Sequence, residues 1–203
     1  AGTNLKFYVI EGVNANDITP IRSTTGAGDV TFSATNGSST VTVNDTAHGA
    51  AQDDFVTFSS AASLGGNITA AVLNQEYQVL SVSGANAFTI TAKDTSGSTV
   101  TANSSDTGNG GSSTVGAYQI NTGLIDYVSA AGWGANPWGD GTWGSGSALS
   151  VSGQLRQFSQ DNFGEDLVFN VRNGGIYYWD QSGGLNSRGV DITSLGGASN
   201  CPT

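Results

Sequence analysis

The sequence predicts an all-β protein, and three observations support this prediction. Short runs with alternating apolar residues recur along the chain, they are rich in Val, Thr, Phe and Tyr, and clusters of Gly, Asn and Ser separate them. β-Branched and aromatic side chains fit a pleated, half-buried surface, while Gly, Asn and Ser are typical of turns. Aromatic residues make up 9% of the chain and charged residues 11%, whereas disordered chains depend on charge and contain few aromatics. We therefore expect many short strands joined by many loops.

The first strand is expected within residues 4–11, where Leu5, Phe7 and Val9 occupy every second position. Pro20 follows soon afterwards. Because proline has no backbone N–H to donate, it is expected in an edge strand or in an extended turn.

The middle of the chain contains several more short alternating runs. They are Val30 to Ala34, Val41 to Val43, Phe55 to Phe58, Tyr77 to Val82 and Phe88 to Ala92. Short strands separated by turn signals are typical of a small β-sandwich or barrel. Residues 69–73 have the best helix propensity of the chain, but they are too few for more than one turn. The Ser/Thr/Gly/Asn tract at 94–114 is expected to form a long mobile hairpin or a surface loop.

A Trp-Gly segment follows the strand character that resumes at residues 117–127. Trp133, Trp138 and Trp143 are five residues apart and each has glycine beside it. This spacing would put successive rings on opposite faces of a strand, so a Gly-rich loop that folds its rings onto a neighbouring surface is expected instead. The three rings are candidate interface or ligand contacts: they could pack within the chain, lie at a subunit interface, where Trp is enriched, or stack on a glycan.

The last third carries the strongest local pattern. Residues 161–164 predict a turn, residues 167–171 and 176–180 predict two strands, and Asn173-Gly174 lies between them. Asn-Gly between alternating runs is typical of a hairpin with a type I′ turn, which needs positive φ at both central residues. We therefore expect positive φ at Gly174. Strand, turn, strand, hairpin and aromatic strand follow one another as in a propeller blade.

Two parts of the chain resemble bacteriophage proteins. The first contains Ala47-His48-Gly49, Asp54-Phe55-Val56-Thr57-Phe58, Leu73-Asn74-Gln75-Glu76-Tyr77-Gln78-Val79 and Phe88-Thr89-Ile90. It resembles a small β module common in phage structural proteins. The second comprises residues 17–22, 132–144 and 155–180. It resembles the tail nozzle or stabilisation (tail tubular protein B-like) family of tailed phages, whose members form a propeller-containing ring below the head and portal.

The second resemblance implies a domain organisation and a location. Residues 1–29 and 117–203 would form a β-rich body resembling part of a β-propeller, with residues 30–116 inserted as a small β-sandwich or barrel. The chain would belong to the virion tail, as a ring-forming homo-oligomer in contact with other tail subunits. Because the family continues where this chain stops, we expect the chain to be a piece of a longer protein.

Charge and cysteine content exclude several function classes. The formal net charge is −10, and the six basic residues are scattered singly. No cationic stripe exists to neutralise a phosphate backbone, so nucleic-acid binding through a basic patch is not expected. No apolar run approaches the roughly 20 residues of a membrane helix. Cys201 is the only cysteine and cannot form an internal disulfide.

No catalytic set is expected, and neither a metal nor a cofactor. His48 is the only histidine. It lies in a turn, no Gly-x-Ser-x-Gly elbow accompanies it, and we expect it to bond to backbone. One His and one Cys cannot supply the usual ligands of zinc. The carboxylates at 53–54, Asp161, Glu165 and Asp166 could form a glycosidase pair, but turn hydrogen bonding is expected for Asp161 and Asp166, with calcium or a subunit contact as alternatives.

Three functions follow from these observations. The first is a non-catalytic structural component of a phage tail, acting through β-rich subunit packing. The second is a receptor- or glycan-binding tail module, for which the Trp-Gly segment and the Ser/Thr/Asn loops argue. The third, a polysaccharide depolymerase, is kept only for the carboxylates.

Overall fold

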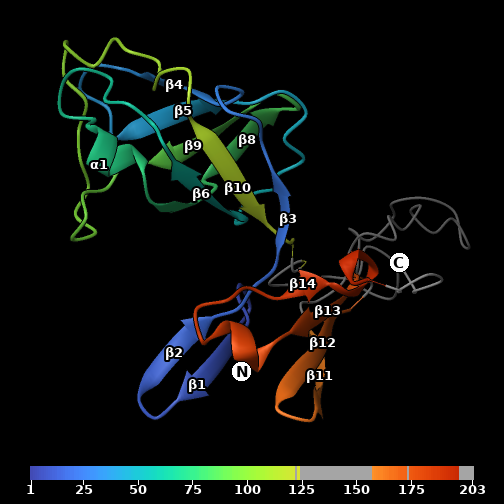
Figure 1. Cartoon of the computed structure of the whole chain (residues 1–203). Helices are drawn as coiled ribbons and strands as arrows, with labels where there is room; N and C mark the ends of the chain where they lie inside the picture. The colour runs from blue at the N-terminus through green and yellow to red at the C-terminus, as the bar shows by residue number, and fades with distance from the viewer. Residues whose placement is uncertain (122, 124–156, 173, 197–203) are drawn as a thin grey trace, which may run out of the picture. The chain divides into compact units, whose positions relative to one another are not determined.

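The structure, a computed structural model, describes residues 1–121, 123, 157–172 and 174–196. It is mostly β, with four small antiparallel sheets and one short α-helix in the described part of the chain (Figure 1). By their contacts the residues divide into two units. Unit 1 comprises Ala1–Ile18 and Thr122–Thr203, and unit 2 comprises Thr19–Asn121. The division into a body of residues 1–29 and 117–203 with residues 30–116 inserted as a small module stays a prediction.

Unit 2 contains two four-stranded sheets. One has the order β3-β10-β6-β7 and the other β4-β5-β9-β8. Their strands are β3 (Ile21–Thr24), β4 (Thr31–Ala34), β5 (Thr40–Asn44), β6 (Phe55–Ser59), β7 (Glu76–Gln78), β8 (Ser81–Gly84), β9 (Ala87–Thr91) and β10 (Val115–Gln119). The alternating runs of the sequence therefore form strands as predicted, and Pro20 directly precedes β3, an edge strand.

One core joins the two sheets of unit 2. Alternate residues of the central strands are buried, among them Val43 in β5, Phe58 in β6 and Phe88 in β9. Phe32 of β4 packs edge-on against Phe58, with ring centroids 5.0 Å apart, and Phe88 meets Tyr118 of β10 in the same geometry at 6.1 Å. Such aromatic pairs add to the free energy gained by burying apolar area.

Helix α1 (Ala70–Leu73) is the single turn that the sequence predicts. Thr69 caps it by accepting a hydrogen bond from the N–H of Val72. None of the described helices has the length and the apolar character needed to cross a bilayer. The tract 94–114 contains no strand and is anchored at Asp106, a buried residue whose Oδ1 accepts a 2.9 Å hydrogen bond from the N–H of Ile68.

Unit 1 contains a two-stranded and a four-stranded sheet. β1 (Tyr8–Glu11) pairs with β2 (Asn14–Asp17). The other sheet has the order β11-β12-β13-β14, formed by β11 (Phe158–Phe163), β12 (Asp166–Val171), β13 (Ile176–Trp179) and β14 (Val190–Asp191). Two short 3-10 helices, η1 (Gln181–Gly183) and η2 (Ile192–Ser194), flank β14.

An aromatic cluster forms the core of unit 1. Phe7 is fully buried and stacks on Phe169 of β12, with ring centroids 4.5 Å apart. Phe158 and Tyr177 pack on either side, at 4.9 Å from Phe7 and 5.7 Å from Phe169. The N-terminal segment is thereby held against the sheet formed near the other end of the chain.

Three expectations are corrected by the structure. The barrel alternative is not realised, since no closed barrel is formed within the described ranges. No propeller is formed there either: β11–β14 make a single four-stranded sheet, and the likeness of the body to part of a propeller stays a prediction. Asp161 to Phe163 belong to β11, and the turn lies later, at Gly164-Glu165.

The third correction concerns the turn before β13. The φ of Gly174 is not positive, and four residues, 172–175, separate β12 from β13 where a type I′ hairpin turn has two. The N–H of Gly174 donates instead to the carbonyl of Val171 at 2.8 Å. The hairpin itself forms where the sequence predicts it.

Candidate functional site

Among the residues that the structure describes, the aromatic cluster covers one face of the β11–β14 sheet, and no other strand or helix packs on the opposite face. Paired residues of antiparallel strands point to the same side. The register therefore places Asp161, Val168, Tyr178 and Val190 in one row across the four strands, on the side opposite Phe169. Phe163 and Asp166 form the next row on this side. We call this side the tyrosine face; its members are Ser159, Asp161, Phe163, Asp166, Val168, Asn170, Ile176, Tyr178 and Val190.

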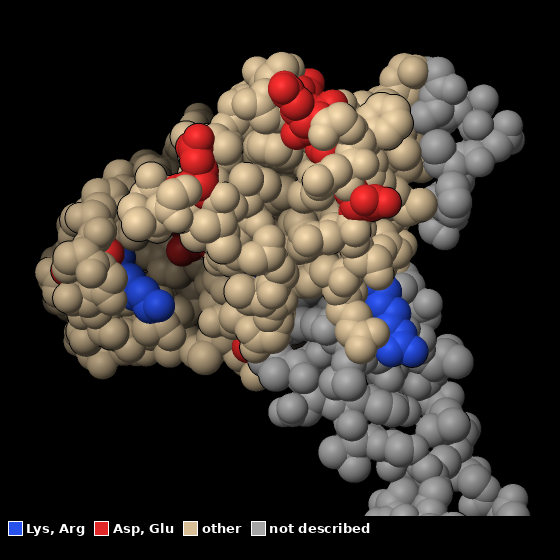
Figure 2. Space-filling model, turned by 90° about the horizontal axis from the view of Figure 1, so that it is seen from below, with Lys and Arg blue, Asp and Glu red and all other residues tan. Residues whose placement is uncertain are grey.

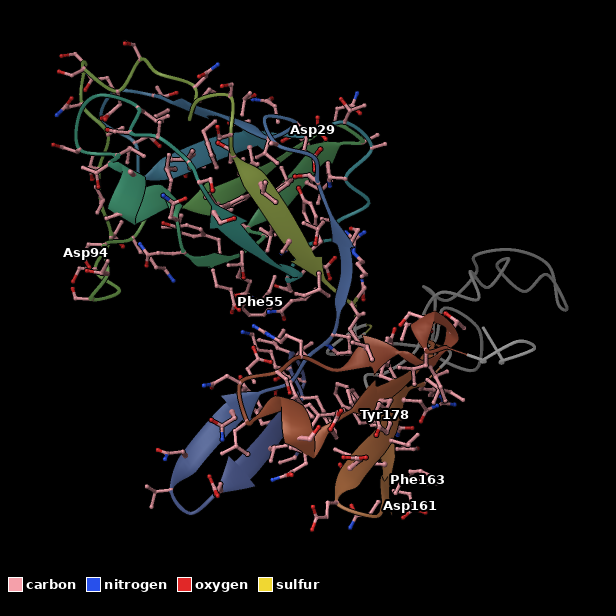
Figure 3. All side chains as sticks on the ribbon, in the orientation of Figure 1. Asp29, Phe55, Asp94, Asp161, Phe163 and Tyr178 are labelled. Carbon is pink, nitrogen blue, oxygen red and sulfur yellow. The ribbon has the colours of Figure 1, made fainter. Side chains whose placement is uncertain are left out.

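The tyrosine face exposes large apolar side chains. Phe163 is 70% exposed and Val190 42%. Figure 3 shows Phe163 and Asp161 near the end of the β11–β12 hairpin, with Tyr178 on the neighbouring strand β13. A depression of about 350 Å³ next to them is lined in part by Ser159, Asp161 and Ile176. Exposed aromatic rings beside polar side chains are typical of contact surfaces.

Tyr178 and Asp166 are tied to each other. The Tyr178 hydroxyl donates a short hydrogen bond to Oδ2 of Asp166, and this bond, together with the adjacent negative charge, raises the pKa of Tyr178 to about 12. Oδ1 of Asp166 accepts a 3.0 Å hydrogen bond from the N–H of Gln181. Both carboxylate oxygens of Asp166 are therefore engaged, which orients the Tyr178 ring on the sheet.

The structure brings together two of the carboxylates named from the sequence. Asp161 and Asp166 are diagonal neighbours on the tyrosine face, a relationship with a Cα separation of about 7–8 Å. They rise from the same side of one sheet, whereas a glycosidase pair faces inward across a cleft. Asp161 Oδ1 accepts from the N–H of Asn162 at 2.9 Å, a local backbone bond made within strand β11 and not in the turn that was expected. The pair Asp53 and Asp54 lies in unit 2.

His48 bonds to backbone through both ring nitrogens, as predicted. Its side chain is buried, and Nδ1 accepts a 3.0 Å hydrogen bond from the N–H of Ala50. Nε2 therefore carries the proton and donates to the carbonyl of Gly84, also at 3.0 Å. Because both ring nitrogens are engaged, neither is free to act as a general base in this conformation.

The remaining candidate residues give no further site. Trp133, Trp138 and Trp143 lie outside the residues that the structure describes, so the role predicted for the Trp-Gly segment stays a prediction. Among the described residues, no group of three or more His, Cys, Asp or Glu side chains is placed to hold a metal ion. Figure 2 shows charged side chains as separate spots on a largely uncharged face, without a continuous basic patch there.

The tyrosine face is not evident as a unit from the sequence. The sequence points to Asp161 and Asp166 through their charge, and its turn signals place Phe163 in a turn. The signal that could have found the face is the alternation of Asp161 and Phe163 with Gln160 and Asn162, which is the period of a strand.

No protein-family model matches the chain, and no curated protein matches it. Among solved structures, the chain is similar to one described as "Phage phi92 endosialidase", with 17% sequence identity and a TM-score of 0.31. The alignment covers 87% of this chain and 24% of that one, so the chain spans about a quarter of its length. At this TM-score the similarity does not establish a common fold. The fold assignment therefore rests on the four antiparallel sheets themselves.

Proposed function

We propose that this chain is a non-catalytic binding module of a phage tail and that it recognises a glycan on the host surface. The resemblance of residues 47–92 and 155–180 to phage virion proteins supports a place in the tail. The observation that carries the binding function is the tyrosine face. It presents Phe163 and Tyr178 beside carboxylate groups on a hydrogen-bonded sheet.

The chemistry of this face suits a sugar polymer. Aromatic rings offer an apolar surface to the C–H groups of a pyranose, and Asp161 and Asn170 offer acceptors and donors to its hydroxyls. Both polar residues belong to strands, so their positions are set by the sheet. Residues on regular elements hold a binding geometry better than residues on loops.

Two features argue for binding without hydrolysis. Asp166 uses both carboxylate oxygens within the protein, which leaves Asp161 without a free carboxyl partner on the same face. A glycosidase needs an acid and a second carboxylate that flank the scissile bond. His48 is equally committed to backbone partners.

The test is binding of the full chain to a glycan array, with Phe163→Ala as the variant. We expect at least one glycan to bind and the variant to bind it about tenfold more weakly, which corresponds to about 1.4 kcal/mol. Val13→Ala is the matched control, because Val13 is a 98% exposed apolar residue between β1 and β2 of the same unit. Silence of the array, or an equal loss in both variants, would contradict the proposal, and so would new reducing ends after incubation with a bound glycan.

A ring-forming structural role in the tail is the second candidate. It is favoured by β11, which is the outer strand of its sheet and has five consecutive exposed residues, Ser159–Phe163. A free strand edge can pair with the edge of another copy. Light scattering of the purified chain at micromolar concentration distinguishes the two: a monomer argues against a ring made by this chain alone.

A further inference from the structure

Unit 2 contains a small cavity, and one of the carboxylates considered from the sequence, Asp53, lies in its wall. It measures about 200 Å³ and lies between the loop before β6, the β7–β8 connection and the end of β9. Gln52 and Asp53 line it from the loop, Tyr77 and Gln78 from β7, Val79 and Leu80 from the β7–β8 connection, and Thr91 and Lys93 from β9 and the residues after it. The cavity is thus lined by polar residues from all three segments together with two aliphatic residues, Val79 and Leu80, and one aromatic residue, Tyr77.

Asp53 is held in place at the wall of this cavity. Its φ of 71° makes it one of three non-glycine residues with positive φ in the described part of the chain. Its N–H donates to the carbonyl of Val79 at 3.0 Å, and its Oδ1 accepts a 3.3 Å hydrogen bond from Nε2 of Gln78. Backbone in this region of φ costs energy and is often found at ligand sites. The surrounding contacts therefore orient one carboxylate and one amide together.

The two charged residues that line the cavity can both form hydrogen bonds with a polar ligand. Asp53 and Lys93 both line it, and no ion pair between them occurs within the described ranges. The ammonium group of Lys93 has three donors, the Asp53 carboxylate accepts hydrogen bonds, and the amide of Gln78 does both. Leu80 is 48% exposed and adds an apolar contact.

We propose that this cavity binds one neutral hexose ring of a glycan. A ring with several adjacent hydroxyls can donate to Asp53 and accept from Lys93 at the same time, while its C–H face contacts Leu80. The volume of about 200 Å³ is below the roughly 300 Å³ of the smallest drug-sized pockets, so it suits a single ring. The proposal rests on the proposed function for the class of ligand, and it adds to the tyrosine face of unit 1 a second sugar site in unit 2.

Saturation-transfer NMR on the full chain with free glucose, galactose, mannose and N-acetylglucosamine tests the proposal. We expect at least one sugar to give a signal and Asp53→Asn to weaken its binding at least tenfold. Asparagine adopts positive φ as readily as aspartate, so this variant is expected to fold. Lys93→Gln should also weaken binding. Asp94→Asn is the control, because Asp94 follows Lys93 but does not line the cavity.

The outcomes separate this proposal from the glycan-binding function of the tyrosine face. The absence of signal from every sugar, or wild-type binding by Asp53→Asn, overturns the cavity proposal. If Phe163→Ala abolishes array binding while Asp53→Asn leaves it intact and no free sugar binds, the tyrosine face is supported and the cavity fails. If Asp53→Asn abolishes sugar binding and Phe163→Ala changes nothing, the cavity is supported and the tyrosine face fails.

Discussion

The phenol of Tyr118 donates a 2.7 Å hydrogen bond to the carboxylate of Asp45, which lies 73 residues earlier in the chain. Both side chains are buried in unit 2, and the guanidinium carbon of Arg22 lies 5.1 Å from the centroid of the Tyr118 ring. Burial, and then the bond to Asp45 and its negative charge, raise the pKa of Tyr118 well above its ordinary value. The bond joins β10 to the residue that follows β5, and so links the two sheets.

Tyr118→Phe is expected to destabilise unit 2. The substitution keeps the ring but leaves the Asp45 carboxylate without its phenolic partner, and a buried polar group left unpaired costs about 1–3 kcal/mol. Urea unfolding followed by circular dichroism measures the loss. Ser83→Ala, at an exposed position of β8, should change the free energy of unfolding little. An equal stability of Tyr118→Phe and wild type would show that the bond contributes nothing.

His48→Leu is expected to cost more than the loss of ring packing alone. Leucine cannot accept from the N–H of Ala50 or donate to the carbonyl of Gly84, the two partners of the imidazole. Two backbone groups are left unpaired, each at about 1–3 kcal/mol. Hydrogen exchange reports the effect directly, because the amide of Ala50 should exchange faster in the variant. Unchanged protection of that amide would contradict the assigned tautomer.

Gly164 and Gly174 are expected to respond differently to alanine. Gly164 has a φ of 70° with open space around it, so Gly164→Ala should cost about 1–2 kcal/mol from the backbone conformation alone. Gly174 has no positive φ, so alanine there causes no strain of this kind, although its added Cβ would lie 3.3 Å from the carbonyl oxygen of Val171. We therefore expect Gly174→Ala to destabilise the chain less than Gly164→Ala does. If Gly174→Ala instead lowered the melting temperature more than Gly164→Ala, the result would support the type I′ turn that the sequence predicts at Asn173-Gly174.

Tyr178 is expected to titrate late at alkaline pH. Its hydrogen bond to Asp166 raises its pKa from 10.0 to about 12, so the folded state favours the protonated phenol. The resulting stabilisation is complete below pH 10 and is lost as the pH rises through about 12. Asp166→Ala removes both the bond and the charge and should return the pKa of Tyr178 toward 10.0. Phenolate absorbance, read as the difference from a Tyr178→Phe variant, isolates this group; an unchanged midpoint in Asp166→Ala would contradict the assignment.

The strands of unit 2 could be predicted from the sequence because their side chains alternate. Val41, Val43, Phe88 and Ile90 stand at every second position and are buried as that period implies. β2 could not be predicted in this way. Its residues, Asn14–Asp17, are Asn, Ala, Asn and Asp, which strands disfavour. They become a strand because β1 supplies the hydrogen-bonding partner.

The candidate site was predicted only in part. The sequence indicated Asp161 and Asp166 but not that Phe163 and Tyr178 share a face with them, because the end of β11 had been assigned to a turn. The cavity in unit 2 was not predictable, since Asp53, Gln78 and Lys93 come from three separate segments. No local pattern reports that such segments meet.

By itself, the sequence determined that this protein is built from short strands, that a hairpin lies at residues 167–179, and that its only histidine lies in a turn and bonds to backbone. These follow from side-chain period and turn chemistry, which act over a few neighbouring residues. The tertiary structure alone decided that β10 pairs with β3 and β6, that Phe7 stacks on Phe169, and which face of the β11–β14 sheet is open. Those outcomes depend on contacts between distant residues, whose formation must offset the entropy of closing long loops.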